Sequence, residues 1–174
     1  SATSLMSGTD YEFYVQADCG GSTSTWAGPF AFTTVCAAYV APYSENFDAA
    51  VGSIPNCWSS SSSSSTDWEF DDSPTFGNSY SDNTTGSGYF AFVDSSTSTT
   101  TTDATLFSPM IDVSTLTTPM LEFYVYHFNN GGASNSIAVE VWDGTTWNQV
   151  YTDLNGDVDG WERIQINLST LTIT

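Results

Sequence analysis

The stretch "SIAVEVWDGTTWNQVYTDL", residues 136–154, decides the fold class. Two runs of strand-forming residues, 136–144 and 147–154, stand on either side of Asp143-Gly144, and Asp-Gly between such runs is the strongest short hairpin signal. Similar runs occur at 89–94, 104–113, 120–128 and 161–168, and no stretch shows helical periodicity. The chain is therefore predicted to be all-β, with antiparallel strands.

The start of the chain has strand patterns of its own. Within 11–17, alternate apolar residues share one face, and 30–34 gives a second short strand, so residues 1–34 form roughly one hairpin. A lone hairpin is at best marginally stable in water. The segment that follows contains Pro42 and small residues, which predicts a linker and a domain boundary near Val35.

Composition limits the classes of partner. The 174 residues are 40% hydrophobic and 15% aromatic, enough for a sizeable core. Twenty acidic residues face one cation, Arg163, and the net charge is −19. Such a surface repels phosphates, so nucleic acid and anionic lipid are excluded as partners, whereas divalent cations are attracted. No apolar run reaches the roughly 20 residues of a membrane span, and the signal-peptide pattern is absent, so we expect a processed chain or a slice of a longer one.

Two stretches have low complexity. Ser59–Ser65 is an unbroken serine run, and residues 95–105 are almost all hydroxyl side chains. Neither can supply core, so both are predicted to be long solvated loops that act as flexible spacers. The alternative, that they carry O-linked sugars, stays open.

Residues 1–35 carry marks of a second domain type. Leu5, Gly8, Thr9, Tyr11, Phe13 and Val15, followed by "ADCGG" and "TSTWAGPFAFTT", resemble the end of a fibronectin type III domain of secreted Bacteroidetes proteins. The resemblance implies the last two strands of an immunoglobulin-like sandwich, with Tyr11 at the tyrosine corner. It also implies that the partner of Cys19 lies outside the sequence.

Residues 36–174 resemble a bacterial MAM domain, the jelly-roll module of meprins, neuropilins and receptor phosphatases. The marks, in order, are Cys36, "ENFD" (45–48), "IPNCW" (54–58), "DW" (67–68), "SDNTTGSGYFAF" (81–92), "LFSPMIDVS" (106–114), "LEFYVYHF" (121–128) and "GWERIQINLS" (160–169). The resemblance implies an antiparallel β-sandwich, a jelly roll, whose closing strands we expect to lie beyond residue 174.

The same resemblance implies a disulfide. Cys36 and Cys57 occupy the places of the family's first disulfide, which would close a loop of about 20 residues and stabilise by roughly 3 kcal/mol. Two alternatives stay open: a pair of free buried thiols, or a bond between Cys36 and Cys19.

A calcium site is the second implication. Converging carboxylates need a cation or a proton, and calcium takes six to eight oxygens. By resemblance the ligands are Asn46, Asp48 and Asp82, with Glu45 as a further candidate. The alternative is ordinary solvated surface charge.

Other candidate sites have structural explanations. The loop 153–160 begins like a calcium loop, but Val158 replaces the required glycine and Ile164 the bidentate glutamate, so a polar hairpin loop is favoured. Trp147 is predicted to be exposed, which makes it a weak candidate for sugar stacking.

His127, the one histidine, lies in a strand pattern and is predicted to be structural; no nucleophile elbow or zinc set appears.

The function predicted from these features is a non-catalytic binding or adhesion region of a large secreted or cell-surface bacterial protein. Its partners would be an extracellular glycan or protein, or copies of itself and neighbouring domains. Two alternatives stay open: an accessory module of an extracellular peptidase or glycan hydrolase, and a structural repeat of an extracellular filament or surface layer.

Overall fold

The computed structural model describes residues 2–64, 66–73, 80–94, 103–127, 136–153 and 160–171. Across these residues all regular secondary structure is β, and no helix suited to crossing a membrane occurs. The strands are β1 (Asp10–Val15), β2 (Ala27–Thr33), β3 (Tyr39–Val40), β4 (Ser59–Ser62), β5 (Glu69–Asp71), β6 (Phe90–Phe92), β7 (Ala104–Phe107), β8 (Ile111–Asp112), β9 (Met120–Val125), β10 (Ile137–Trp142), β11 (Trp147–Asp153) and β12 (Glu162–Asn167).

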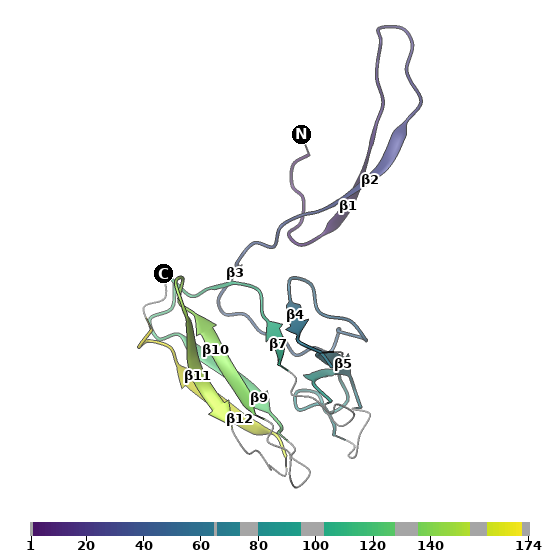
Figure 1. The fold of residues 1–174 in the computed structure, drawn as a ribbon. Coiled ribbons are helices and arrows are strands. Elements are labelled where there is room, and N and C mark those ends of the chain that lie inside the picture. The colour runs from purple at the N-terminus through teal and green to yellow at the C-terminus, as the bar shows by residue number, and fades with distance from the viewer. Residues whose placement is uncertain are drawn as a thin grey trace.

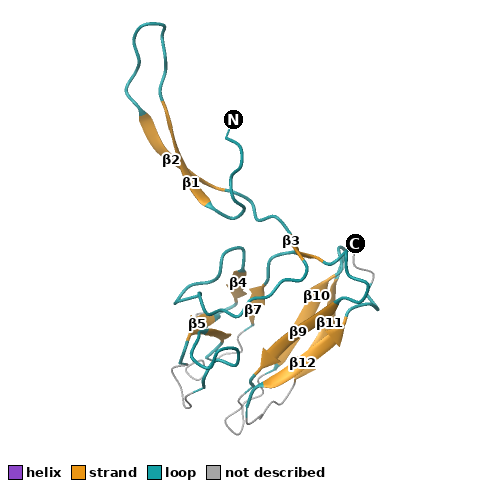
Figure 2. Cartoon of the chain, turned by 180° about the vertical axis from the view of Figure 1, so that it is seen from behind, coloured by secondary structure: helices purple, strands orange, loops and turns teal. Residues whose placement is uncertain are grey.

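The strands pair into ladders that form an antiparallel β-sandwich, as predicted. β1 pairs with β2, β4 with β7, β5 with β6, β9 with β12 and β10 with β11, all antiparallel. The short pair of β3 and β8 is parallel. Beyond the first hairpin, β9 to β12 lie side by side on one side of the domain, and β4, β5 and β7 lie on the other (Figures 1 and 2).

The predicted Asp-Gly hairpin is confirmed. β10 and β11 pair from Ile137 opposite Asp153 to Trp142 opposite Trp147. In the turn, Asp143 Oδ1 accepts hydrogen bonds from the amides of Thr145 and Thr146, each at 2.8 Å. These bonds, led by the one from Thr146, hold the pKa of the Asp143 carboxyl well below its usual range.

The serine run is a strand, so the prediction of a solvated loop over 59–65 is wrong for its first half. Ser59–Ser62 form β4 and pair with Ala104–Phe107. The strand is stabilised by ladder hydrogen bonds and by its half-buried hydroxyls: Ser60 Oγ donates to Asp67 Oδ2 at 2.8 Å, and Ser62 Oγ donates to the Thr66 carbonyl. Ser65 and most of the second low-complexity stretch, residues 95–102, lie outside the described residues.

Two further boundaries differ from the sequence pattern. The run 104–113 is divided into β7 and β8, because Pro109 cannot donate a ladder hydrogen bond. The linker predicted after Val35 contains β3, which pairs with β8 through hydrogen bonds from the Tyr39 amide to the Met110 carbonyl and from the Ala41 amide to the Asp112 carbonyl, both at 2.9 Å.

A small core lies between the layers. Its buried apolar side chains among the described residues are Ala50, Phe70, Phe90, Val125 and Leu168. Three half-buried tryptophans lie around it: Trp58, Trp68 and Trp161. Trp161 packs edge-on against Phe90 at 5.6 Å, and its indole N–H donates to the Ser81 carbonyl at 2.9 Å, so the ring ties the core to the loop after residue 80.

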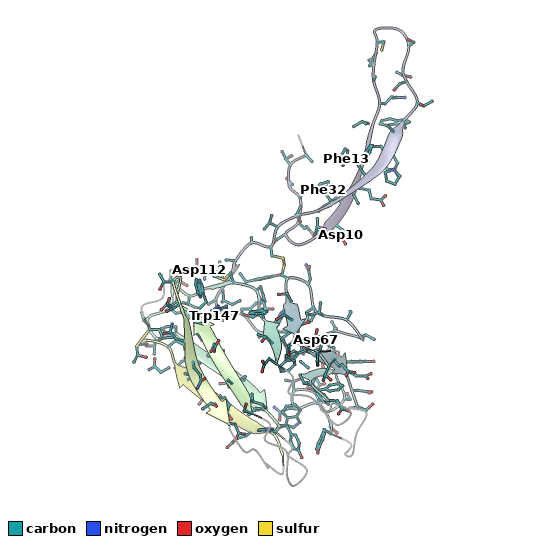
Figure 3. The ribbon with its side chains drawn as sticks, viewed as in Figure 1. Asp10, Phe13, Phe32, Asp67, Asp112 and Trp147 are labelled. Atoms are coloured by element: carbon teal, nitrogen blue, oxygen red, sulfur yellow. A yellow bond between two sulfur atoms is a disulfide. The ribbon has the colours of Figure 1, made fainter. Side chains whose placement is uncertain are left out.

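The first hairpin projects from the sandwich (Figure 1). Tyr11 lies opposite Phe32 and Phe13 opposite Phe30, so one face of the hairpin is aromatic. Phe13 and Phe32 are labelled in Figure 3 and are 45% and 39% exposed. This face is therefore left largely open to solvent.

Candidate functional site

The disulfide joins Cys36 to Cys57, with the two Cα atoms 5.7 Å apart. The pairing implied by the family resemblance is confirmed, and Cys19 is a free, exposed thiol. The bond lies where the hairpin meets the sandwich: a Cβ added at Gly8 would come within 2.5 Å of Cys57 Sγ and 2.8 Å of Cys36 Sγ. The disulfide therefore marks the junction between the two parts of the chain.

Asp82 is the most strongly bonded of the predicted metal ligands. It is 6% exposed, and its Oδ2 accepts hydrogen bonds from the amides of Thr85 and Gly86 and from the hydroxyls of Thr84 and Thr85, at 2.5 to 3.2 Å. Burial raises the pKa of Asp82, but the hydrogen bonds from Thr85 and Thr84 together outweigh it and lower the pKa from 3.8 to about 2. The carboxylate is therefore fully ionised at neutral pH.

Asp48 lies against the same loop. Phe47 adopts a positive φ of 63°, and the turn lets Asn46 Nδ2 donate to Asp48 Oδ2 at 2.7 Å. The other carboxylate oxygen, Asp48 Oδ1, is buried and has no hydrogen-bond partner. It lies where a Cβ at Gly88 would be, at 1.5 Å, so only glycine leaves room for it.

The two carboxylates adjoin one loop without forming a closed acidic cluster. Thr85 Oγ1 is 2.9 Å from Asp82 Oδ2 and would lie 3.0 Å from a Cβ at Gly88. No group of three or more His, Cys, Asp or Glu that could hold an ion occurs in the part of the chain that the structure describes. A calcium ion there would need amide, hydroxyl, carbonyl or water oxygens besides Asp48 and Asp82, which is a donor set that calcium accepts.

Glu45, the fourth predicted ligand, is engaged elsewhere. Its Oε1 accepts the Phe47 amide at 2.8 Å. The pKa of Tyr43 is raised, mainly by burial and further by the charge and hydrogen bonding of Glu45, although the Trp58 hydrogen bond acts in the opposite direction. Glu45 therefore belongs to the surroundings of Tyr43.

A cleft of about 430 Å³ opens beside β3. Tyr39 and Tyr43 line it with their rings 5.0 Å apart and inclined by 49°. The other lining residues are Glu45, Ala49, Ala50, Ser53, Ile54, Pro55 and Asn56. A second hollow of about 270 Å³ shares Ser53 and Ile54 and extends to Trp68. The two hollows therefore adjoin at Ser53 and Ile54.

His127 is buried, as expected for a structural side chain, but it lies just beyond β9. Its Nδ1 is 3.0 Å from Asp153 Oδ2, and its Nε2 is buried without a hydrogen-bond partner. Asp153 is the first residue of the calcium-like loop 153–160, and in the structure its carboxylate interacts with the His127 imidazole. The following residues of that loop, 154–159, lie outside the described residues.

Trp147 is 51% exposed, as predicted, and is labelled in Figure 3. Its ring packs against Trp142 at 5.5 Å and Phe107 at 6.0 Å. The Trp147 ring is therefore part of an aromatic cluster with Trp142 and Phe107. Sugar stacking on this ring stays a prediction.

The tyrosine cleft was missed by sequence reasoning. Tyr39 and Tyr43 bracket Pro42 in the segment interpreted as a linker, where no period-two pattern marks a surface. Their four-residue spacing next to Glu45 was the available signal. All residues that line the cleft lie within 39–56, so the chain folds back on itself locally to form it.

A comparison with models of known protein families gives a match. The family model "MAM domain, meprin/A5/mu" matches residues 46–173, which is most of the chain. No curated protein matches. No solved structure matches.

Proposed function

The chain belongs to the MAM domain family, and we propose that it is a non-catalytic binding or adhesion region of a large secreted or cell-surface bacterial protein. MAM domains are generally non-catalytic extracellular modules that mediate protein interactions. The observation that carries the proposal is the family match over a disulfide-bonded β-sandwich. Disulfides persist in oxidising compartments, which supports an extracellular setting.

We also propose that residues 1–35 are the closing hairpin of a fibronectin type III domain, with the MAM domain over 36–174. The Tyr11 hydroxyl accepts the Met6 amide at 2.8 Å, which is the type of bond that a tyrosine corner makes to upstream backbone. The exposed aromatic face around Phe13 and Phe32 supports the same interpretation, because a sandwich buries that face against a second sheet.

Calcium is proposed as a structural ion at Asp48 and Asp82, with Asn46 in support. The buried, unpartnered Asp48 Oδ1 supports this proposal, since such an oxygen is costly to desolvate unless a donor or cation compensates it. The ion would supply positive charge between two segments of the sandwich, at residues 46–48 and 82–88. Glu45 is left out of this set because it lines the cleft beside Tyr43.

Adhesion of the isolated chain tests the proposed function. The oxidised chain is coupled to beads, and bead retention is measured on surfaces coated with extracellular glycans or proteins. We expect retention on a restricted set of surfaces, with saturable competition by free chain. An unrelated protein of equal negative charge should not compete, which separates recognition from general electrostatic attraction.

Two outcomes would contradict the proposal. Retention on no glycan or protein surface would remove the binding function. Concentration-dependent end-to-end assembly in sedimentation experiments, without retention on any surface, would favour the filament alternative instead.

A further inference from the structure

The cleft beside β3 has a preformed aromatic wall. Tyr39 is held in β3 by the ladder to β8, through its amide bond to the Met110 carbonyl at 2.9 Å. The Tyr43 hydroxyl accepts the Trp58 indole N–H at 3.0 Å, which fixes the second ring. The backbone of Tyr39 and the ring of Tyr43 are therefore in place before a ligand binds, and the two rings contact each other, which reduces the freedom lost on binding.

The charge around this wall is negative. Glu45 lines the cleft, and its charge contributes to the raised pKa of Tyr43 after the larger effect of burial. The chain has a single Lys or Arg residue, Arg163, whose Nη2 already lies 2.7 Å from Glu122 Oε2 on the β9–β12 ladder. The chain therefore has no free basic side chain to offer the cleft.

This combination selects a cationic ligand. The face of a tyrosine ring attracts ammonium and guanidinium groups, and a neighbouring carboxylate adds a charge-assisted hydrogen bond. Phosphate and carboxylate ligands are disfavoured by Glu45 and by the net charge of −19. The cleft, at about 430 Å³, lies within the usual range for ligand sites, so it has room for a side chain with adjoining backbone.

We propose that this cleft binds an arginine or lysine side chain presented by a partner protein. The inference rests on the proposed binding function and adds the chemistry that the partner must present. Tyr39 and Tyr43 contact the face of the cationic group and its methylenes, while Glu45 accepts its N–H donors.

The test uses matched peptides. The oxidised chain is titrated with acetyl-Gly-Arg-Gly-amide, and the citrulline peptide serves as the neutral control of nearly the same shape. Binding is followed by backbone amide shifts in NMR spectra at physiological salt. We expect saturable shifts confined to residues 39–45 and 53–56 with the arginine peptide, a weaker response to the lysine peptide, and none with citrulline.

Variants separate the cleft from general attraction to an acidic protein. Glu45→Gln and Tyr39→Leu should each weaken arginine binding by roughly 3- to 30-fold, the range expected for one cation–π or charge contact. Glu12→Gln removes one charge on the distant hairpin, and Tyr14→Ala removes an exposed ring there, so neither should change binding. Tyr39→Leu keeps an apolar side chain in β3, and Glu45→Gln provides a second test if that strand is disturbed.

Three outcomes would overturn the proposal: equal binding of arginine and citrulline peptides, equal effects of Glu45→Gln and Glu12→Gln, or shifts spread over the whole surface without saturation. Displacement of the arginine peptide by a neutral sugar would show a glycan site instead. If the arginine peptide binds in the cleft but beads are retained on no surface, the cleft stands and the adhesion function fails. If beads adhere and Glu45→Gln leaves adhesion unchanged, the function stands and the cleft is not its contact.

Discussion

The carboxylate of Asp82 is buried, yet it is ionised at neutral pH. Hydrogen bonds from Thr84, Thr85 and Gly86 compensate the charge, and the same donors shape the 82–88 loop around it. The shape of the loop thus depends on one side chain, which is also a proposed calcium ligand. A change at Asp82 affects the loop first and any bound ion through it.

Asp82 makes folding stability sensitive to acid. Its pKa is lowered from 3.8 to about 2, so the ionised form stabilises the folded state above about pH 4, and that contribution is lost as pH falls to about 2. The size is on the order of 2 kcal/mol. We expect Asp82→Asn to lower the free energy of unfolding at pH 7 and to flatten its dependence on pH between about 4 and 2, measured by denaturant unfolding without divalent cations.

The control for this measurement is Glu12→Gln, which removes an exposed carboxylate of the hairpin. It should leave the slope of stability against pH close to that of the unmodified chain. An Asp82→Asn chain with an unchanged slope over the same pH range would show that the hydrogen bonds to Asp82 do not stabilise the fold.

At the scale of elements, the hairpin is joined to the sandwich through a tight contact. The Ser7 hydroxyl donates to the Val35 carbonyl at 3.2 Å and accepts the Ala37 amide at 2.7 Å. Gly8, with a φ of +57°, lies directly against both sulfurs of the disulfide. Figure 3 shows the yellow disulfide at the base of the hairpin. The junction between hairpin and sandwich therefore consists of the turn at Gly8 packed against the Cys36–Cys57 disulfide.

We expect Gly8→Ala to open this joint. A methyl group there would collide with Cys57 Sγ and Cys36 Sγ, and the positive φ adds backbone strain. Thermal unfolding should shift to lower temperature, and limited proteolysis should cut near Val35 at a higher rate. Gly20→Ala is the matched control, because Gly20 also has a positive φ, +73°, but has nothing within 4 Å.

We expect the destabilisation by Gly8→Ala to depend partly on the disulfide. Replacing both Cys36 and Cys57 by alanine is expected to cost about 3 kcal/mol, since the bond closes a loop with a sequence separation of 21. Without the sulfurs, Gly8→Ala should cost less than it does in the disulfide-bonded chain. Equal costs in the two backgrounds, measured by denaturant unfolding, would mean that Gly8 and the disulfide are not coupled.

The long strands of the sandwich were predictable from the sequence, and three of its short strands, β3, β4 and β5, were not. The β9, β10, β11 and β12 segments have alternating apolar residues, and β10 and β11 flank a strong turn signal, so local pattern and tertiary packing agree. β3, β4 and β5 are two to four residues long, and β4 is all serine, which has little intrinsic preference for strands. Those three exist because a partner strand pairs with them.

The candidate sites likewise divide into those that the sequence could predict and those that it could not. The cysteine pairing could be anticipated through the family resemblance. The tyrosine cleft could not, because its lining residues all lie within 39–56, a segment that begins as a predicted linker and has no periodic apolar pattern. Glu45 was a further calcium candidate by family resemblance, and the structure places it against Tyr43 and the Phe47 amide.

At the scale of the whole molecule, a net charge of −19 opposes compact folding through self-repulsion. Calcium should reduce the repulsion specifically between Asp48 and Asp82, and any salt should reduce the repulsion over the whole surface by screening. We expect calcium to raise the thermal unfolding temperature by several degrees relative to chelator at equal ionic strength. The measurement compares calcium with magnesium, which demands a stricter geometry and should stabilise less.

Variants complete this experiment. Asp48→Asn should abolish the calcium-dependent shift, whereas Asp112→Asn, which removes an exposed carboxylate, should preserve it. A shift of equal size with magnesium, or one that survives Asp48→Asn, would mean general screening, and the proposed ion site would be removed.

The serine strand has a consequence for how the chain tolerates length changes. Because residues 59–65 are identical, sliding β4 forward by one or two positions presents the same side chains to β7. The register of β4 against β7 must therefore be set by side-chain hydrogen bonds at its two ends. Before the strand, the Trp58 indole N–H donates to the Tyr43 hydroxyl; after it, Asp67 accepts the Ser60 hydroxyl. An extra serine would be absorbed in the turn ahead of Asp67, leaving both anchors and the sandwich undisturbed.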